Sequence, residues 1–248
     1  MKLASGAGHS PNCDGARGNG YSENAEAQKL NKLFIAICER NGVACVDCSS
    51  SAGSQTAYLT EQSRKFNASG ASVKLQWHFN SGGGTGCECL FRPGGGGWQT
   101  ASDISAAIAG VAGFKDRGAK SRTDLYILNT VSNAFIIEVA FIDSWSDMQA
   151  VVGKYPQIAA AVFKAVTGID PEEDDMEPVD VWAYKNKAVN PNYIDVYDML
   201  TRCTKAAEKI EAGTAEVDYE KLSDLVAGKI GDRVAAKVAD LFAARLQE

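Results

Sequence analysis

The chain has 248 residues, of which 45% are hydrophobic and 23% are charged, a composition typical of a soluble globular protein with room for one large domain or for a domain and a smaller piece. The formal net charge of −6 argues against nucleic acid as a partner, and no run of about 18 apolar residues is present to form a membrane-spanning helix. The first residues lack an apolar stretch of signal-peptide length, so we expect synthesis in the cytoplasm and, for any action outside a cell, another route of release.

The cysteines indicate the same compartment. There are seven of them, and an odd number without a signal sequence predicts reduced thiols. Cys45 and Cys48 have C-x-x-C spacing, and Cys87 and Cys89 have C-x-C spacing. Each pair alone supplies only half of a zinc or redox site, and we interpret these residues as structural or surface thiols.

Helices and strands are expected to alternate from residue 1 to about residue 168. Residues 26–40 carry apolar side chains at helical spacing, and Asn41-Gly42 is a typical helix end. A short strand is predicted over 43–48, a helix over 55–69 and a strand over 72–80, in which apolar and polar side chains alternate strictly.

The second half of this region contains two glycine clusters, at 82–84 and 94–97, with Gly86 between them, and these predict loops. Further along, the pattern predicts a helix over 101–113, strands over 124–128 and 133–141, and one helix over 146–167. The alternation predicts an α/β fold with a mostly parallel, twisted sheet flanked by helices.

The composition changes after residue 168. Six acidic residues fall within 170–177, and without them 25 acids balance 25 bases. We therefore expect a domain over 1–168, an acidic linker over 169–180 and a small helical region over 181–248. Two interpretations of that last region stay open: a helical hairpin packed on the first domain, or a self-association helix that makes a homo-oligomer.

The two histidines of the chain are the strongest candidates for chemistry. His9 lies in a glycine-rich loop, and His78 lies at the C-terminal end of the 72–80 strand, opposite its apolar side. Sites in open α/β sheets collect at the C-terminal edge of the strands, so we expect the two rings to meet there. A catalytic zinc takes three protein ligands and leaves one position to water, and Glu23 and Glu26 are the nearby carboxylates.

Glu138 stands within the apolar stretch "AFIIEVAF". A carboxylate in a buried strand is costly unless it is paired, hydrogen-bonded or beside a metal. It is therefore either the partner of an arginine such as Arg17 or Arg122, or a base held over a water that zinc activates.

Four stretches together resemble a known family. "GHSPNCDGARGNGYSE" resembles the opening motif of the zinc-dependent N-acetylmuramoyl-L-alanine amidases (amidase type 3), because His9 and Glu23 are fourteen positions apart, as are the first two zinc ligands of that motif. "LQWHFNS" is similar to the strand of the third ligand, and "FIIEVAFIDSWSDM" to the strand and loop of the catalytic glutamate. The motifs follow the family order over about residues 3–168.

The resemblance implies one Zn²⁺ ion held by His9, Glu23 and His78, with Glu138 as general base for the water and proton donor to the leaving amine. The implied reaction is hydrolysis of the amide between N-acetylmuramic acid and L-alanine in peptidoglycan. The chain departs from the family at Ser10-Pro11, where glycine is common, and the nearby Cys13 is a candidate for competition as a metal ligand or for oxidation. Glu26 stays an alternative to Glu23, although the spacing favours Glu23.

Other functions remain to be weighed against this one. Zinc peptidases that cut the peptide stem place their first two ligands closer together, and a non-catalytic wall-binding module would not need Glu138. "GGGTG" opens no helix and has no acidic partner, which disfavours a dinucleotide site. In lacking a signal peptide, the chain resembles phage or prophage endolysins, which reach the wall after a holin opens the membrane. Under this interpretation, wall targeting is a further candidate role of the 181–248 region.

Overall fold

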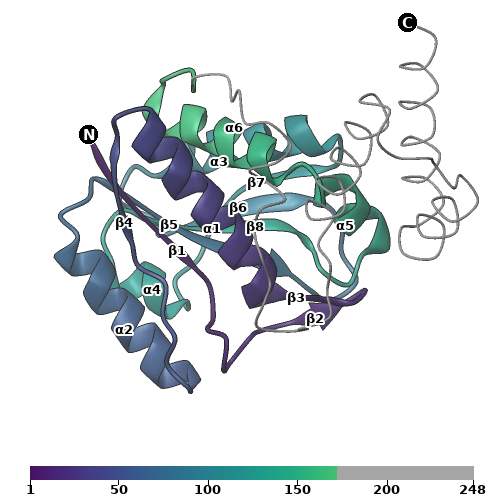
Figure 1. Ribbon diagram of the computed structural model, residues 1–248, viewed down its shortest axis with the longest axis horizontal. Helices are drawn as coiled ribbons and strands as arrows, with labels where there is room; N and C mark the ends of the chain where they lie inside the picture. Colours follow the sequence, from purple (N-terminus) through teal and green to yellow (C-terminus); the bar gives the residue numbers. More distant parts are fainter. Residues whose placement is uncertain (172–248) are drawn as a thin grey trace, which may run out of the picture. The chain divides into compact units, whose positions relative to one another are not determined.

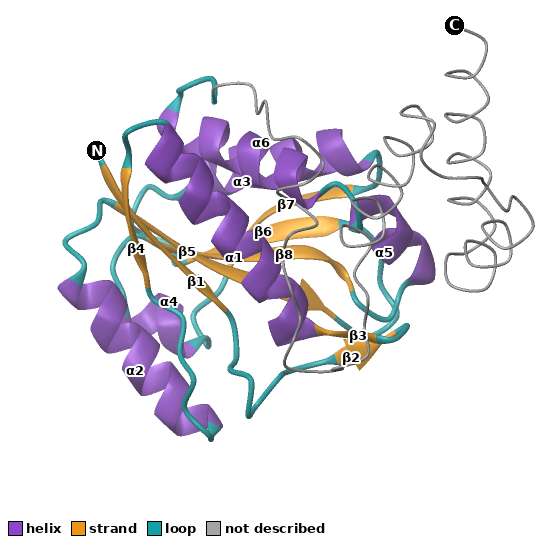
Figure 2. Cartoon of the chain, in the orientation of Figure 1, coloured by secondary structure: helices purple, strands orange, loops and turns teal. Residues whose placement is uncertain are grey.

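The computed structural model describes residues 1–171. A six-stranded sheet runs through the centre of this region in the order β4-β1-β5-β8-β6-β7 (Figure 2). The strands are β1 Lys2–Ala7, β4 Ala44–Asp47, β5 Val73–Asn80, β6 Cys87–Phe91, β7 Asp116–Ser121 and β8 Ala134–Phe141. Neighbouring strands are parallel except for β6 and β8, so the expected α/β fold with a mostly parallel sheet is confirmed.

Helices cover both faces of the sheet (Figure 1). The helices are α1 Glu23–Arg40, α2 Gln55–Ala68, α3 Trp98–Ala112, α4 Tyr126–Thr130, α5 Trp145–Val151 and α6 Tyr155–Thr167. The larger core cluster joins α1, α3 and α6 to one face of the sheet, and the smaller one joins α2 and α4 to the other. None of the helices within 1–171 is long and apolar enough to cross a membrane.

The alternation along β5 decides which side chains face which layer. Leu75, Trp77 and Phe79 are buried in the larger core cluster beneath α1. Since successive side chains of a strand point to opposite faces, Gln76 and His78 are directed to the other face. This is the arrangement that the sequence predicts, and it leaves His78 outside the apolar core.

Two predicted elements are wrong. Residues 124–128, expected as a strand, lead into the short helix α4, where Ile127 and Leu128 pack in the smaller core cluster. Residues 146–167, expected as one helix, form α5 and α6, because Gly153 has a left-handed φ of 90° and the helix restarts at Tyr155-Pro156.

The strands β6 and β7 have no counterpart among the predicted elements. A further small antiparallel pair, β2 Arg17–Gly18 with β3 Tyr21–Ser22, precedes α1. The predictions for the linker and for residues 181–248 fall almost entirely outside the described residues.

Candidate metal centre

His9 lies in the loop that follows β1. Its backbone has a φ of 60°, in the left-handed region that a residue with a side chain rarely adopts. Hydrogen bonds on both sides of His9 hold this loop. Gln62 Nε2 of α2 donates to the Ala7 carbonyl at 2.7 Å, and Ser10 Oγ donates to the Ala52 carbonyl at 2.6 Å. The surrounding structure therefore fixes a conformation that the loop alone would not prefer.

Glu23, the first residue of α1, lies between the two histidines. Its Oε1 is 2.8 Å from His78 Nδ1, and its Oε2 is 3.1 Å from His9 Nε2. The Ala16 backbone N–H also donates to Oε2, at 2.8 Å. Burial opposes ionisation of Glu23, but the hydrogen bonds with His78 and His9 outweigh it and hold the pKa of Glu23 well below its usual value.

Two glycines leave the space that these side chains fill. A Cβ on Gly8 would lie 2.3 Å from both Cε1 and Nε2 of His78. A Cβ on Gly15 would lie 2.4 Å from Glu23 Oε2 and 2.6 Å from His9 Cδ2. Real Cβ atoms do not approach other atoms so closely, so both positions require glycine for the three side chains to converge.

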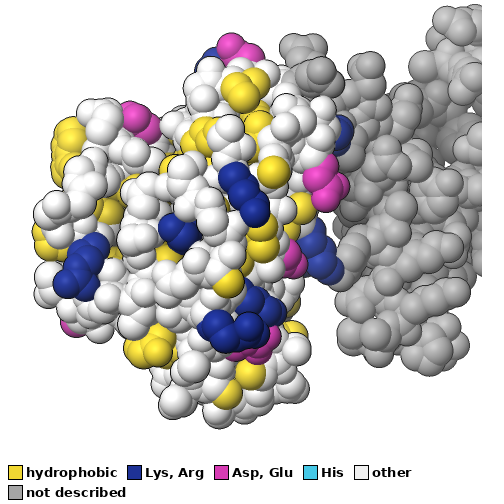
Figure 3. All heavy atoms as spheres, turned by 90° about the vertical axis from the view of Figure 1, so that its left-hand side faces the viewer, with side chains coloured by type: hydrophobic (Ala, Val, Ile, Leu, Met, Phe, Trp, Pro, Cys, Tyr) yellow, Lys and Arg dark blue, Asp and Glu magenta, His cyan; other side chains and the backbone are white. Residues whose placement is uncertain are grey.

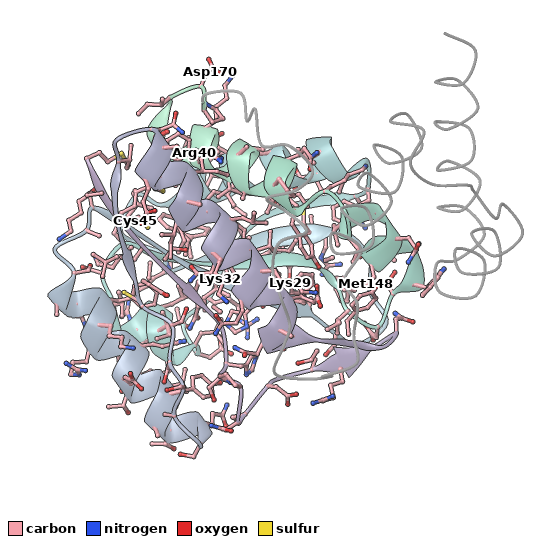
Figure 4. All side chains as sticks on the ribbon, viewed as in Figure 1. Lys29, Lys32, Arg40, Cys45, Met148 and Asp170 are labelled. Carbon is pink, nitrogen blue, oxygen red and sulfur yellow. The ribbon has the colours of Figure 1, made fainter. Side chains whose placement is uncertain are left out.

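Glu26 is directed away from the histidines. Its carboxylate accepts hydrogen bonds from Lys29 Nζ at 2.8 Å and from the Tyr155 hydroxyl at 2.8 Å. Lys29 lies on α1 (Figure 4), and Tyr155 begins α6. Glu26 thus joins two helices, and Glu23 is the carboxylate that meets both rings.

Glu138 faces the same group from the neighbouring strand. It is paired in register with His78, so the two side chains lie side by side on the same face of the sheet. Its Oε2 is buried and has no hydrogen-bond partner among the described residues. Burial, opposed by the charge of His78 and reinforced by Glu23 and Glu88, raises the pKa of Glu138 to about 7.

The arginines considered as partners of Glu138 have other partners. Arg17 pairs with Asp14, and Arg122 forms two hydrogen bonds with Asp124, at 2.8 and 2.7 Å. On β6, Glu88 lies opposite Glu138 and forms an ion pair with Arg117 at 2.8 Å. Glu138 is therefore a half-buried residue whose buried Oε2 has no ion-pair or hydrogen-bond partner among the described residues.

The donor atoms of His9, Glu23 and His78 fit a zinc ion. They all lie within 4.8 Å of one another, and imidazole nitrogens with a carboxylate oxygen are a common zinc ligand set. Within residues 1–171, no other group of three His, Cys, Asp or Glu side chains converges in this way, so neither cysteine pair joins a metal-binding cluster there. Cys45 lies on β4 at the edge of the sheet (Figure 4).

Figure 3 draws one face of the molecule, and the candidate site is not seen on it. Neither histidine appears on the face drawn in Figure 3, where Lys and Arg side chains occur at separate places. On that face the basic side chains do not form one continuous strip.

Two acids that follow β8 hold the glycine loop that comes after β5. Asp143 Oδ2 accepts hydrogen bonds from the backbone N–H groups of Gly82 and Gly83, at 2.9 and 2.8 Å. Asp147 Oδ2 accepts from Gly86 N at 2.8 Å and from Phe141 N at 3.1 Å. The glycine loop after β5 is thus attached to the strand that carries Glu138.

Tyr58 is a site residue that the sequence did not reveal. Its hydroxyl lies 3.1 Å from His9 Nδ1, and burial raises the pKa of Tyr58 to about 12, so the phenol keeps its proton at neutral pH. Tyr58 stands at a helical spacing typical of a core residue, and no sequence pattern distinguishes it from one.

Comparison with known proteins gives a consistent picture. Residues 6–168 match the family Amidase_3, N-acetylmuramoyl-L-alanine amidase. The chain is 30% identical over 155 residues to N-acetylmuramoyl-L-alanine amidase CwlM of Bacillus licheniformis, and 30% identical over 151 residues to a sporulation-specific N-acetylmuramoyl-L-alanine amidase of Bacillus subtilis. The matches cover 60% and 59% of this chain and 60% and 58% of the two relatives.

Solved structures share the fold. The catalytic domain of the CD27L endolysin targeting Clostridia difficile has a TM-score of 0.63 at 24% identity, and the match covers 68% of this chain and 97% of that one. The catalytic domain of CwlV from Bacillus (Paenibacillus) polymyxa var. colistinus has a TM-score of 0.60 at 18% identity, and the match covers 68% and 97% of the two chains.

Proposed function

Since this chain belongs to the Amidase_3 family, the N-acetylmuramoyl-L-alanine amidases, we propose that it hydrolyses the amide bond between N-acetylmuramic acid and L-alanine in peptidoglycan. The observation that carries this proposal is the convergence of His9, Glu23 and His78 next to Glu138. The substrate is the one that the names of the Bacillus relatives imply.

His9 Nε2, Glu23 and His78 Nδ1 would hold one zinc ion. The fit rests on their mutual distances and on the glycine positions that make room for the three side chains. When bound, zinc polarises the scissile carbonyl and makes water a better nucleophile at neutral pH. The ligand residues come from the β1 loop, the start of α1 and the end of β5, so the fold orients them before a metal arrives.

Glu138 is the general base in this proposal. Its unpartnered oxygen accepts the proton of the attacking water and then returns that proton to the leaving nitrogen of L-alanine. A carboxylate beside the metal ligands with a free oxygen is placed both to take a proton from water and to give it to a leaving amine.

The two alternatives from the sequence are less well supported. A peptidase that cuts the stem would use the same kind of metal site, but the family match favours the muramoyl amide. A non-catalytic wall-binding module has no need of a carboxylate with a buried, unpartnered oxygen beside the metal ligands.

Host lysis by a phage-type endolysin stays a prediction. The similar proteins include bacterial amidases as well as an endolysin catalytic domain. The amide cleaved would be the same in either setting.

Digestion of purified peptidoglycan, followed by mass spectrometry of the products, tests the proposal. We expect free stem peptides that begin with L-alanine, loss of this cleavage with a chelator, and recovery with zinc. Cuts within the stem would indicate a peptidase, and wall binding without cleavage would indicate a binding module.

A further inference from the structure

Tyr58 contacts the outer side of the His9 ring, away from Glu23. The two aromatic rings have centroids 5.6 Å apart at an interplanar angle of 56°, and the Tyr58 hydroxyl lies 3.1 Å from His9 Nδ1. The opposite nitrogen, Nε2, is the atom that faces Glu23. The two nitrogens of His9 therefore have different partners, and the proposed reaction does not use Tyr58.

The chemistry of imidazole makes this contact relevant to metal binding. A neutral histidine that offers the lone pair of Nε2 must carry its proton on Nδ1. A tyrosine hydroxyl both donates and accepts hydrogen bonds, so it can accept that Nδ1–H. Partners of this kind fix the tautomer and the orientation of metal-binding histidines.

We propose that Tyr58 is a positioning residue that holds His9 in the tautomer and orientation needed to bind the metal through Nε2. The inference rests on the proposed metal site. It adds a residue that touches neither metal nor substrate and acts through His9.

The same helix also holds the backbone of His9. Gln62 follows Tyr58 by four residues on α2, so both side chains lie on one face of that helix. Gln62 Nε2 donates to the Ala7 carbonyl at 2.7 Å and lies 3.4 Å from the His9 carbonyl oxygen. One face of α2 therefore constrains both the left-handed backbone and the ring of His9.

The start of α2 is capped within the chain, which supports the position of Tyr58. Ser54 caps the helix by accepting from Ala57 N, and Tyr58 N donates to the Ser54 carbonyl at 2.9 Å. Tyr58 is 3% exposed, so its hydroxyl cannot easily exchange His9 for solvent.

The variant Tyr58→Phe tests the proposal because it removes the hydroxyl and keeps the ring. We expect zinc affinity, measured by competition with a chromophoric chelator, to fall about 10- to 100-fold. The thermal midpoint of the metal-free protein checks that the fold is kept. Tyr126→Phe is the matched control: Tyr126 is exposed on α4, and its variant should bind zinc as the unmodified chain does.

A second measurement follows the proton directly. Because the chain has only two histidines, ¹H–¹⁵N spectra of the zinc-loaded protein can assign each ring proton. We expect a His9 Nδ1–H signal protected from solvent exchange, and its loss in Tyr58→Phe.

Equal zinc affinity of Tyr58→Phe and the unmodified chain, or a protected Nδ1–H signal in both, would overturn the role of Tyr58. If Tyr58→Phe is unchanged in these measurements but the unmodified chain cleaves peptidoglycan with zinc, the positioning role of Tyr58 fails and the proposed function stands. If the unmodified chain binds no zinc, the proposed metal site fails with it.

Discussion

Gly8 and Gly15 act through the space that they leave open. A side chain on Gly8 would overlap the His78 ring, and one on Gly15 would overlap both Glu23 and His9. Gly15 also has a φ of 76°, which favours glycine, whereas the requirement at Gly8 comes from close contact alone. Substitution of Gly8 is therefore a clean test of whether convergence of these side chains holds the metal.

We expect Gly8→Ala to weaken zinc binding by at least about tenfold, because either the His78 ring or the loop must leave its present position. Isothermal titration with zinc measures this. Gly110→Ala is the control: Gly110 lies in α3 with nothing within 4 Å of an added Cβ, so it should leave zinc binding unchanged and stabilise the fold by about 0.5–1 kcal/mol. Unchanged affinity in Gly8→Ala would count against the ligand set.

Glu138→Gln separates catalysis from metal binding. The amide keeps the size of the side chain but cannot accept the proton of the attacking water, so hydrolysis should fall by about 10²- to 10⁴-fold. Zinc content, measured by elemental mass spectrometry, should stay at one ion per chain. His78→Ala should lose the zinc as well as the activity.

Substantial hydrolysis by Glu138→Gln would contradict the role of Glu138. Stoichiometric zinc in His78→Ala would remove His78 from the ligand set.

At this scale the sequence predicted much of the candidate site. His9, Glu23, His78 and Glu138 stand in stretches whose order and spacing resemble one family, and the structure brings them together. The spacing favours Glu23 over Glu26, and the structure adds what the sequence leaves open, that Glu26 meets Tyr155 through packing of α1 on α6. Tyr58 was not predictable, since its role depends on how α2 packs on the His9 loop.

Among the elements, α1, α2 and β5 are predictable because their apolar side chains recur with a clear period. The sequences of β6 and β7 have no such pattern, so these strands are not predicted. The strand β6 has five buried residues between glycine-rich loops, so it shows no alternation of apolar and polar side chains. The strand β7, DRGAKS, is a polar edge strand that is paired on one side only, with β6. Pairing within the sheet, rather than local propensity, makes both segments strands.

The helix α4 is also difficult to predict from the sequence of its residues alone. The residues of 124–128 include types favoured in strands, yet Ile127, Leu128 and Val131 are the side chains that enter the smaller core cluster. Their spacing is helical, and this signal extends beyond the five residues that suggested a strand.

The contact between α5 and the glycine loop gives a prediction for an element. Asp147 is 3% exposed and accepts two buried backbone hydrogen bonds, from Gly86 and Phe141. Asp147→Ala leaves both donors without that acceptor, and at about 1–3 kcal/mol per buried donor the free energy of unfolding should fall by about 2–6 kcal/mol. Urea denaturation of the metal-free protein measures this.

The matched control is Asp103→Ala on α3. Asp103 is exposed and accepts from Gln99 at 2.8 Å, so its loss should change stability little. A small effect of Asp147→Ala, similar to that of Asp103→Ala, would show that the Asp147 contacts do not hold the loop.

For the described molecule as a whole, the three candidate ligands join segments far apart in the sequence. His9 follows β1, Glu23 begins α1 and His78 is near the end of β5, so the three ligands meet only in the folded chain. A metal bound to all three would therefore stabilise the folded state and not the unfolded one. Free zinc at 100 times its dissociation constant should add about 2.7 kcal/mol. For a domain of about 150–250 residues this raises the thermal midpoint by about 5–10 °C.

Thermal unfolding with zinc and with a chelator checks this, and His78→Ala should show no such difference. An equal midpoint in both conditions for the unmodified chain would mean that zinc does not bind the folded state.

The most direct test of the metal centre is an anomalous difference map from crystals of the zinc-loaded chain, collected at the zinc absorption edge. We predict one peak bonded to His9 Nε2, Glu23 and His78 Nδ1, on the side of the sheet that Glu138 faces. A peak at other residues, or none at this site in zinc-loaded crystals, would contradict the proposed metal centre.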